Sequence, residues 1–144
     1  MNDENLAADL IVADAADLPY ESNFFDCIVD SAVLYANTIE GIKVILKQMH
    51  KINKINGKIF STGLFNLKTT GYGSGKKIDK NTECDLKYGA LSGLGTVHFF
   101  TCDEILKIWS EVGYDDIKID ILERTENNGE YSIGYYIVEA VKKQ

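Results

Sequence analysis

Residues 10–37 read LIVADAADLPYESNFFDCIVDSAVLYAN and decide the fold. Two short apolar runs in this stretch each stop on an aspartate, residues 10–13 on Asp14 and residues 27–29 on Asp30. A run of about four apolar residues that ends on a polar one is typical of a strand buried on both faces in a parallel sheet. Ligands of open α/β sheets bind beyond the carboxyl ends of such strands, so both carboxylates are candidate binding residues. The alternative is that both are turn residues, because aspartate is favoured where a strand stops.

The composition indicates one globular domain, residues 1–144, with 45% hydrophobic and 26% charged residues. The formal net charge of −7 repels phosphate backbones, so we expect no nucleic-acid partner. No apolar run approaches the roughly 20 residues of a membrane span. The acidic start MNDENLAAD lacks the basic region of a secretory signal. We therefore expect a cytoplasmic protein with no membrane contact.

The cysteines and histidines predict neither a disulfide framework nor a metal site. Cys27, Cys84 and Cys102 form no CxxC pair, and their number is odd. Cys27 lies inside an apolar run and is predicted to be a small core residue. His50 and His98 have no metal-ligand partners at the spacing that zinc sites use.

Periodicity and end signals predict the remaining elements. A helix is expected at 39–52 with Thr38 as its N-cap. A second helix is expected between Thr101, which forms a capping box with Glu104, and Gly113. Strands are expected at residues 8–13, 27–30, 58–64, 115–123 and 132–141, with a hairpin-type turn at 127–129 joining the last two.

Residues 66–97 form a long segment rich in glycine, threonine, serine and lysine. A loop of this length inside a compact domain is normally functional or disordered. Scattered apolar residues give it some anchorage, so we predict a partly ordered, lid-like insertion.

The order and spacing of several short motifs resemble the C-terminal two-thirds of a class I S-adenosylmethionine-dependent methyltransferase, of the small ubiquinone- or menaquinone-biosynthesis-like type. The motifs are Asp14-Ala15, Leu18-Pro19-Tyr20, Phe25-Asp26, Tyr35-Ala36-Asn37, Asn56-Gly57-Lys58, His98-Phe99-Phe100-Thr101 and Gly113-Tyr114. The resemblance implies an α/β fold of truncated Rossmann-like type. Its sheet would be mostly parallel, with about five strands and a C-terminal antiparallel hairpin.

The resemblance also implies a site for S-adenosylmethionine and a small-molecule acceptor. Asp14 would accept from the adenine amino group, the Ala15 backbone would meet the ring, and Leu18 would pack on its face. Asp30, Ser31 and Ala32 would line the methionine end of the cofactor. Tyr35 and His98 are weak candidates for contact with the acceptor or for a catalytic base, and a structural role is the alternative for Tyr35.

The chain departs from the family in one respect: the glycine-rich loop and the acidic residue that hold the cofactor would both precede it. Gly71-Tyr72-Gly73-Ser74-Gly75 opens no helix and is a poor substitute. Without the intervening strands, the strands at 8–13 and 27–30 would expose unpaired edges. They could pair directly with each other, or a second copy could complete a homodimer, or the chain could be a fragment of a longer product.

Three functions stay open at this point. The first is methyl transfer to a small acceptor, which works mainly by positioning the reactants. The second is a non-catalytic methyltransferase remnant that serves as an interaction module. The third is a weak nucleotide-binding module that uses only the adenine corner.

Overall fold

The computed structural model describes residues 7–144. Its strands are β1 (Phe25–Ser31), β2 (Asn53–Phe65), β3 (Lys76–Lys77), β4 (Thr82–Cys84), β5 (Val97–His98), β6 (Tyr114–Glu126) and β7 (Tyr131–Lys142). Its helices are the short 3-10 helix η2 (Leu34–Ala36) and the α-helices α1 (Ile39–Ile52) and α2 (Cys102–Val112). No helix in this part of the chain is long and apolar enough to cross a membrane.

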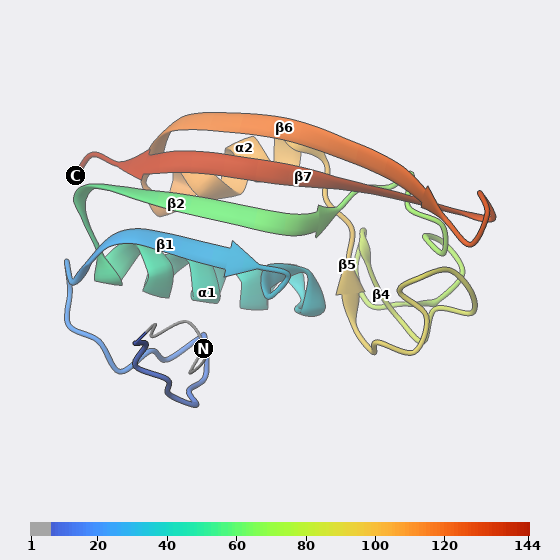
Figure 1. Ribbon diagram of the computed structural model, residues 1–144, viewed down its shortest axis with the longest axis horizontal. Coiled ribbons are helices and arrows are strands. Elements are labelled where there is room, and N and C mark those ends of the chain that lie inside the picture. Colours follow the sequence, from blue (N-terminus) through green and yellow to red (C-terminus); the bar gives the residue numbers. More distant parts are fainter. Residues whose placement is uncertain (1–6) are drawn as a thin grey trace.

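Four strands form the main sheet, in the order β1-β2-β7-β6 (Figure 1). Only β1 and β2 run parallel, whereas β7 pairs antiparallel with both β2 and β6. The sheet is therefore mixed, and the prediction of a mostly parallel sheet of about five strands is wrong. The predicted C-terminal hairpin is confirmed, with the turn at 127–129 between two long strands.

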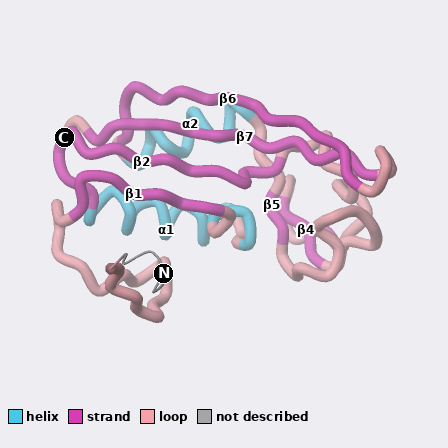
Figure 2. Tube along the Cα trace, viewed as in Figure 1, coloured by secondary structure: helices cyan, strands magenta, loops and turns pink. Residues whose placement is uncertain are grey.

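Both α-helices lie on one face of this sheet (Figure 2). Helix α1 begins after Thr38, whose hydroxyl accepts from the Gly41 N–H, and α2 begins after Thr101, whose hydroxyl accepts from the Glu104 N–H. These are the two predicted N-caps, and both are confirmed. The side chain of Glu104, predicted to complete a capping box, contacts the His98 ring instead. The core between helices and sheet contains Ile42, Ile45, Leu46, Met49, Ile59, Leu64, Ile105, Ile108, Trp109, Val138 and Ala140.

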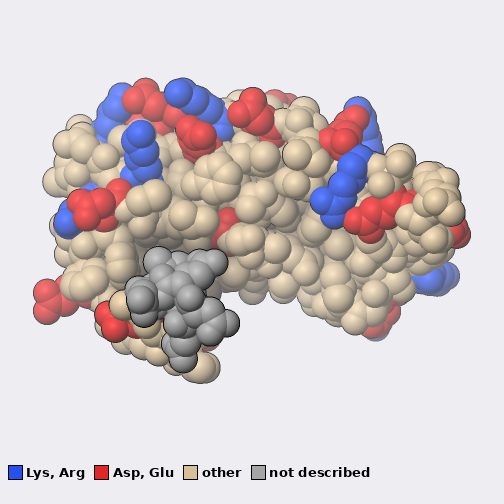
Figure 3. All heavy atoms as spheres, viewed as in Figure 1, with Lys and Arg blue, Asp and Glu red and all other residues tan. Residues whose placement is uncertain are grey.

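The opposite face of the main sheet has no helix covering it in the described part of the chain. Figure 3 looks onto this face: its centre carries few charged side chains, and those in view lie along the edge over β6 and toward the two ends of the molecule. A groove of about 600 Å³ runs over it, lined in part by Cys27, Phe60, Glu139 and Val141. Cys27 is exposed, so its prediction as a core residue is wrong. The reason is that only the α1 side of β1 is covered.

The predicted strand at 8–13 is absent. Residues 7–14 form no strand, and the side chain of Val12 is fully exposed. Strand β1 pairs only with β2 in the described part of the chain, so direct pairing of 8–13 with 27–30 is also wrong. An apolar run needs a partner edge for its N–H and C=O groups before it becomes a strand. The free edge of β1 remains, and a homodimer through it stays a prediction.

Residues 66–97 are more ordered than the glycine content suggests. Strands β3 and β4 and, beyond the loop, β5 form a small antiparallel sheet of their own. A second apolar cluster, to which β5 contributes Val97, is formed by Leu86, Leu91, Val97 and Phe99. We call residues 66–98, which include β3, β4 and β5, the insert.

Candidate functional site

The carboxyl end of β1 turns sharply after Ser31. Ala32 has φ +59°, which is rare for a residue with a side chain, and its N–H donates to the Thr62 carbonyl at 3.0 Å. Gly63, which lies beside this turn on β2, also has a positive φ, and a Cβ there would lie 3.0 Å from the Cβ of Ala32. The two strand ends therefore pack against each other, and the strained backbone marks a candidate site.

Asp30, the residue before Ser31, is buried and hydrogen-bonded within this turn. It is 2% exposed, and its Oδ1 accepts from the Val33 N–H at 3.1 Å. Its Oδ2 and the neighbouring Ser61 hydroxyl have no hydrogen-bond partner among the described residues. Burial raises the pKa of Asp30, and the hydrogen bond from the Val33 N–H is the largest of the weaker effects that oppose it. Asp30 therefore caps a turn with one oxygen and keeps the other without a partner.

Asp14 lies in a turn and not at the end of a strand. Its Oδ1 accepts from the Ala16 N–H at 2.9 Å, and its carbonyl accepts from the Asp17 N–H at 3.0 Å. The side chain is exposed, whereas Ala15 and Ala16 pack against the main core and Leu18 is half-buried. The expectation that Asp14 ends a neighbouring strand of the same sheet is wrong, because that strand does not form.

Tyr35 lies on η2, directly after the Asp30 turn. Its ring meets the ring of Phe65 edge-on, with centroids 5.0 Å apart. It packs against both the main core and the apolar cluster of the insert. Tyr35 is half-buried and so stands where these two parts meet, beside the carboxyl end of β1.

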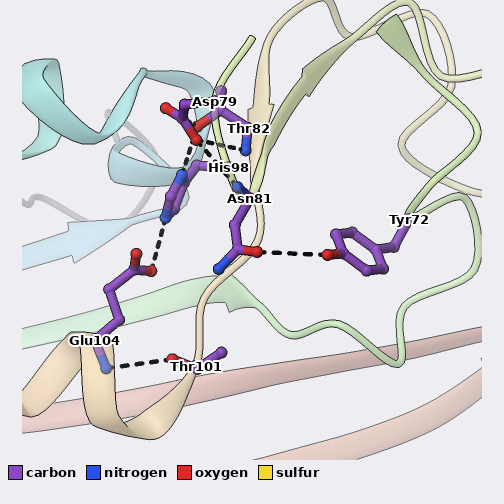
Figure 4. Close-up of polar contacts among 7 residues, drawn as sticks. All are labelled: Tyr72, Asp79, Asn81, Thr82, His98, Thr101 and Glu104. Atoms are coloured by element: carbon purple, nitrogen blue, oxygen red, sulfur yellow. Dashed lines mark hydrogen bonds and ion pairs between the residues drawn. The ribbon is translucent and has the colours of Figure 1, made fainter. Parts of the chain in front are cut away.

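His98 is buried, and both of its ring nitrogens have partners. Nδ1 lies 2.6 Å from the Thr82 hydroxyl, and Nε2 lies 2.8 Å from Glu104 Oε2 (Figure 4). The Thr82 hydroxyl also lies 2.7 Å from Asp79 Oδ2. The sequence identified Glu104 only as a capping residue, and it did not single out Asp79 or Thr82. The spacing of Asp79 and Thr82, which forms a turn, was the one local signal for them.

The structure thus brings Asp30, Ser31 and Ala32 together at one strand end, with Tyr35 following on η2. The turn at 14–18 lies outside the sheet. None of the predicted site residues lines the groove on the face of the main sheet that no described helix covers. Within residues 7–144 no group of three or more His, Cys, Asp and Glu side chains could hold a metal ion.

Comparison with known proteins connects this fold to methyltransferases. Residues 1–61 match the family described as a methyltransferase domain. No curated protein sequence matches the chain significantly.

Three solved structures show the likeness. A SAM-dependent methyltransferase from Methanosarcina mazei is 18% identical with a TM-score of 0.68, over 90% of this chain and 65% of that one. A 1,6-didemethyltoxoflavin-N1-methyltransferase from Burkholderia thailandensis, with its substrate and S-adenosylhomocysteine bound, is 13% identical with a TM-score of 0.61, over 93% of this chain and 50% of that one. A phosphoethanolamine N-methyltransferase from Haemonchus contortus, in complex with S-adenosyl-L-methionine, is 14% identical with a TM-score of 0.61, over 91% of this chain and 36% of that one.

The chain therefore spans between about a third and two thirds of the length of these structures. At these identities the likeness concerns the fold. The chain shares the α/β fold of S-adenosylmethionine-dependent methyltransferases, and its first 61 residues carry the sequence pattern of a methyltransferase domain.

Proposed function

We propose that the chain is an S-adenosylmethionine-dependent methyltransferase, or a part of one, that acts on a small-molecule acceptor. The observation that carries this proposal is the side chain of Asp30. It is buried at the carboxyl end of β1, and its Oδ2 accepts no hydrogen bond from the described residues. The match of residues 1–61 and the shared fold support it. Ligands of α/β sheets bind at such strand ends.

The residues at this strand end fit the charge of the cofactor. S-adenosylmethionine would supply a methyl group on a positively charged sulfonium, and it also carries an ammonium group. A buried carboxylate whose pKa is raised by desolvation regains its charged form beside a cation. We assign Asp30, with Ser31 and Ala32, to the methionine end.

The adenine end fits less completely. Asp14 is exposed and accepts from Ala16 with one oxygen. Ala15 and Leu18 are partly buried beside it. We assign these three residues to adenine on the resemblance, and the described residues hold no glycine-rich turn that opens a helix to cradle the rest of the cofactor.

Positioning of the acceptor would account for catalysis by this chain. Tyr35 stands next to the Asp30 turn and is our candidate for contact with the acceptor. Both nitrogens of His98 are engaged in hydrogen bonds, so we favour a structural role for it over that of a base. In-line alignment of the acceptor needs no covalent intermediate.

Calorimetric titration with S-adenosylmethionine and S-adenosylhomocysteine tests this proposal. We expect a dissociation constant in the micromolar range, and Asp30→Asn should weaken binding by about tenfold, the loss of one charge-assisted contact. Asp26→Asn, an exposed carboxylate on the same strand that pairs with Lys54, is the matched control and should bind like the wild type. No heat at millimolar ligand would instead favour the alternative, a non-catalytic remnant that acts as an interaction module.

The same substitution should stabilise the fold. The folded protein binds the Asp30 proton more tightly than the unfolded chain, because the folded pKa lies above the ordinary 3.8. Stability is therefore lost as the pH rises through the folded pKa. We expect Asp30→Asn to raise the free energy of unfolding by about 1 kcal/mol near pH 7, since the amide keeps the Val33 bond and can donate toward Ser61.

Urea unfolding at two pH values measures this effect. The gain from Asp30→Asn should shrink as the pH falls through the folded pKa of Asp30, because the wild-type carboxyl then takes up a proton as well. Asp26→Asn should have a small effect of the opposite sign, because the Lys54 hydrogen bond lowers the pKa of Asp26 but this ion pair is exposed to solvent. A loss of stability in Asp30→Asn at neutral pH would show that the buried carboxylate has a donor that the structure does not identify.

A further inference from the structure

A buried chain of hydrogen bonds joins the insert to helix α2. Asp79 Oδ2, the Thr82 hydroxyl, the His98 ring and Glu104 Oε2 follow one another at 2.7, 2.6 and 2.8 Å. Thr82 and His98 are almost fully buried, at 0% and 1% exposed. Figure 4 shows the His98 ring between the residues of the insert and the first turn of α2.

The donors and acceptors in this hydrogen-bond chain constrain which nitrogens of the His98 ring carry hydrogen. Asp79 accepts the N–H groups of Asn81 and Thr82, and hydrogen bonds from Thr82 and Asn81 outweigh desolvation and hold its pKa below the usual range. An ionised carboxylate can only accept, so the single proton of the Thr82 hydroxyl must go to Asp79. The Thr82 oxygen must then accept from His98 Nδ1.

The other side of the ring has the same requirement. Glu104 Oε2 faces Nε2 at 2.8 Å, and an ionised carboxylate can accept a hydrogen bond there only from a ring that carries hydrogen on Nε2. A ring with hydrogen on both nitrogens would satisfy the Thr82 oxygen and Glu104 at the same time. Charge-assisted hydrogen bonds of this kind are about twice as strong as neutral ones.

Neighbouring elements leave this arrangement undisturbed. Glu83 on β4 is buried, but its carboxylate accepts from the Gly73 and Gly75 N–H groups within the insert. The Phe100 ring meets His98 edge-on, with centroids 4.6 Å apart. Glu104 is fixed in place because its own N–H is capped by Thr101 at 3.2 Å.

We propose that Asp79, Thr82, His98 and Glu104 form a proton-dependent latch, in which the doubly protonated His98 ring fastens the insert to the start of α2. Loss of the second ring proton would leave one nitrogen of the buried ring facing an acceptor oxygen with no hydrogen between them, which is costly. The insert then separates from α2. Glu104 is 24% exposed at its side chain and provides the route by which the proton reaches solvent.

The latch is tested on the protein without any ligand, so its outcome is independent of methyl transfer. Nitrogen-15 NMR of the histidine rings at about pH 7.5, where a free imidazole is mostly neutral, should show both His98 nitrogens protonated. Amide hydrogen exchange of residues 76–84 should rise about tenfold in Thr82→Val, which removes one hydrogen bond from each of its neighbours. Thr82→Ser keeps the hydroxyl and should restore wild-type exchange.

Two further variants separate the latch from general destabilisation. Glu104→Gln removes the charge but keeps the shape, and should raise exchange in the insert and lower the ring protonation. Glu111→Gln, an exposed position on the same helix that pairs with Lys107, should change neither. A His98 ring with a single proton, or insert exchange unchanged in both Thr82→Val and Glu104→Gln, would overturn the proposal. If Thr82→Val does not fold, the ring protonation of the wild type and of Glu104→Gln still decides it.

Discussion

Gly89→Ala is expected to destabilise the insert by more than about 3 kcal/mol, since both strain and overpacking act at this position. Gly89 has φ +91°, and a Cβ built there would lie 2.2 Å from the Thr70 carbonyl oxygen and 2.9 Å from its carbon. Both obstacles are backbone atoms, so no side chain can swing away. The backbone segments around residues 70 and 89 must move apart before an alanine side chain fits.

Gly93→Ala is the matched control for this substitution. Gly93 has φ +79°, but a Cβ there would meet nothing within 4 Å. It carries the backbone strain alone, which costs about 1 kcal/mol. Urea unfolding combined with amide exchange over residues 70–91 measures both variants. Equal and small effects would mean that 70 and 89 are not packed together and that the segment is a flexible loop.

The order of the insert could not be predicted from its composition. Glycine is used both where a chain is flexible and where a fixed turn needs a positive φ, and the sequence does not distinguish the two uses. Here Gly73 and Gly75 direct their N–H groups at the buried carboxylate of Glu83. That contact brings together residues eight to ten positions apart in an irregular segment. No periodic pattern in the sequence predicts this contact.

The helices were predictable because their signals are local. Thr38 and Thr101 stand directly before the periodic apolar residues and act through atoms three residues away. The strand expected at 8–13 failed for the opposite reason. Its apolar run is real, but a strand also needs an edge to pair with, and that edge is a property of the whole fold.

The candidate site was predictable in part. Asp30 was identified from the end of an apolar run, and its buried, half-partnered carboxylate fits that prediction. The network around His98 was not, because Thr82 and Glu104 come from different elements, each with an ordinary local role. Only the packing of the insert against α2 brings these side chains together.

Lys142→Met is expected to lower the free energy of unfolding by about 3 kcal/mol or more, because it leaves buried acceptors without a donor. Lys142 is 6% exposed, and its ammonium donates to the His50 carbonyl at 2.8 Å, the Asn53 carbonyl at 2.9 Å and Asn23 Oδ1 at 3.0 Å. Two of these oxygens lie at the C-terminal end of α1, where a cation complements the helix dipole. Desolvation lowers the pKa of Lys142, and its three acceptors are neutral oxygens.

The titration of His50 gives this prediction a second readout. Desolvation first, and then the charge of Lys142, lower the pKa of His50 from its ordinary 6.5. The unfolded chain therefore binds this proton more readily, and the wild type loses stability as the pH falls through about 6.5. In Lys142→Met the pKa of His50 should rise, and that acid-dependent loss should become smaller.

Lys143→Met is the control, because Lys143 is exposed and pairs with Asp116 at 2.8 Å on the surface. An exposed ion pair contributes little, so its removal should leave stability and the His50 titration nearly unchanged. NMR titration of the histidines and urea unfolding of the three proteins provide the comparison. If Lys142→Met were as stable as Lys143→Met, the carbonyls of His50 and Asn53 would be satisfied by solvent, and the end of α1 would be open to water.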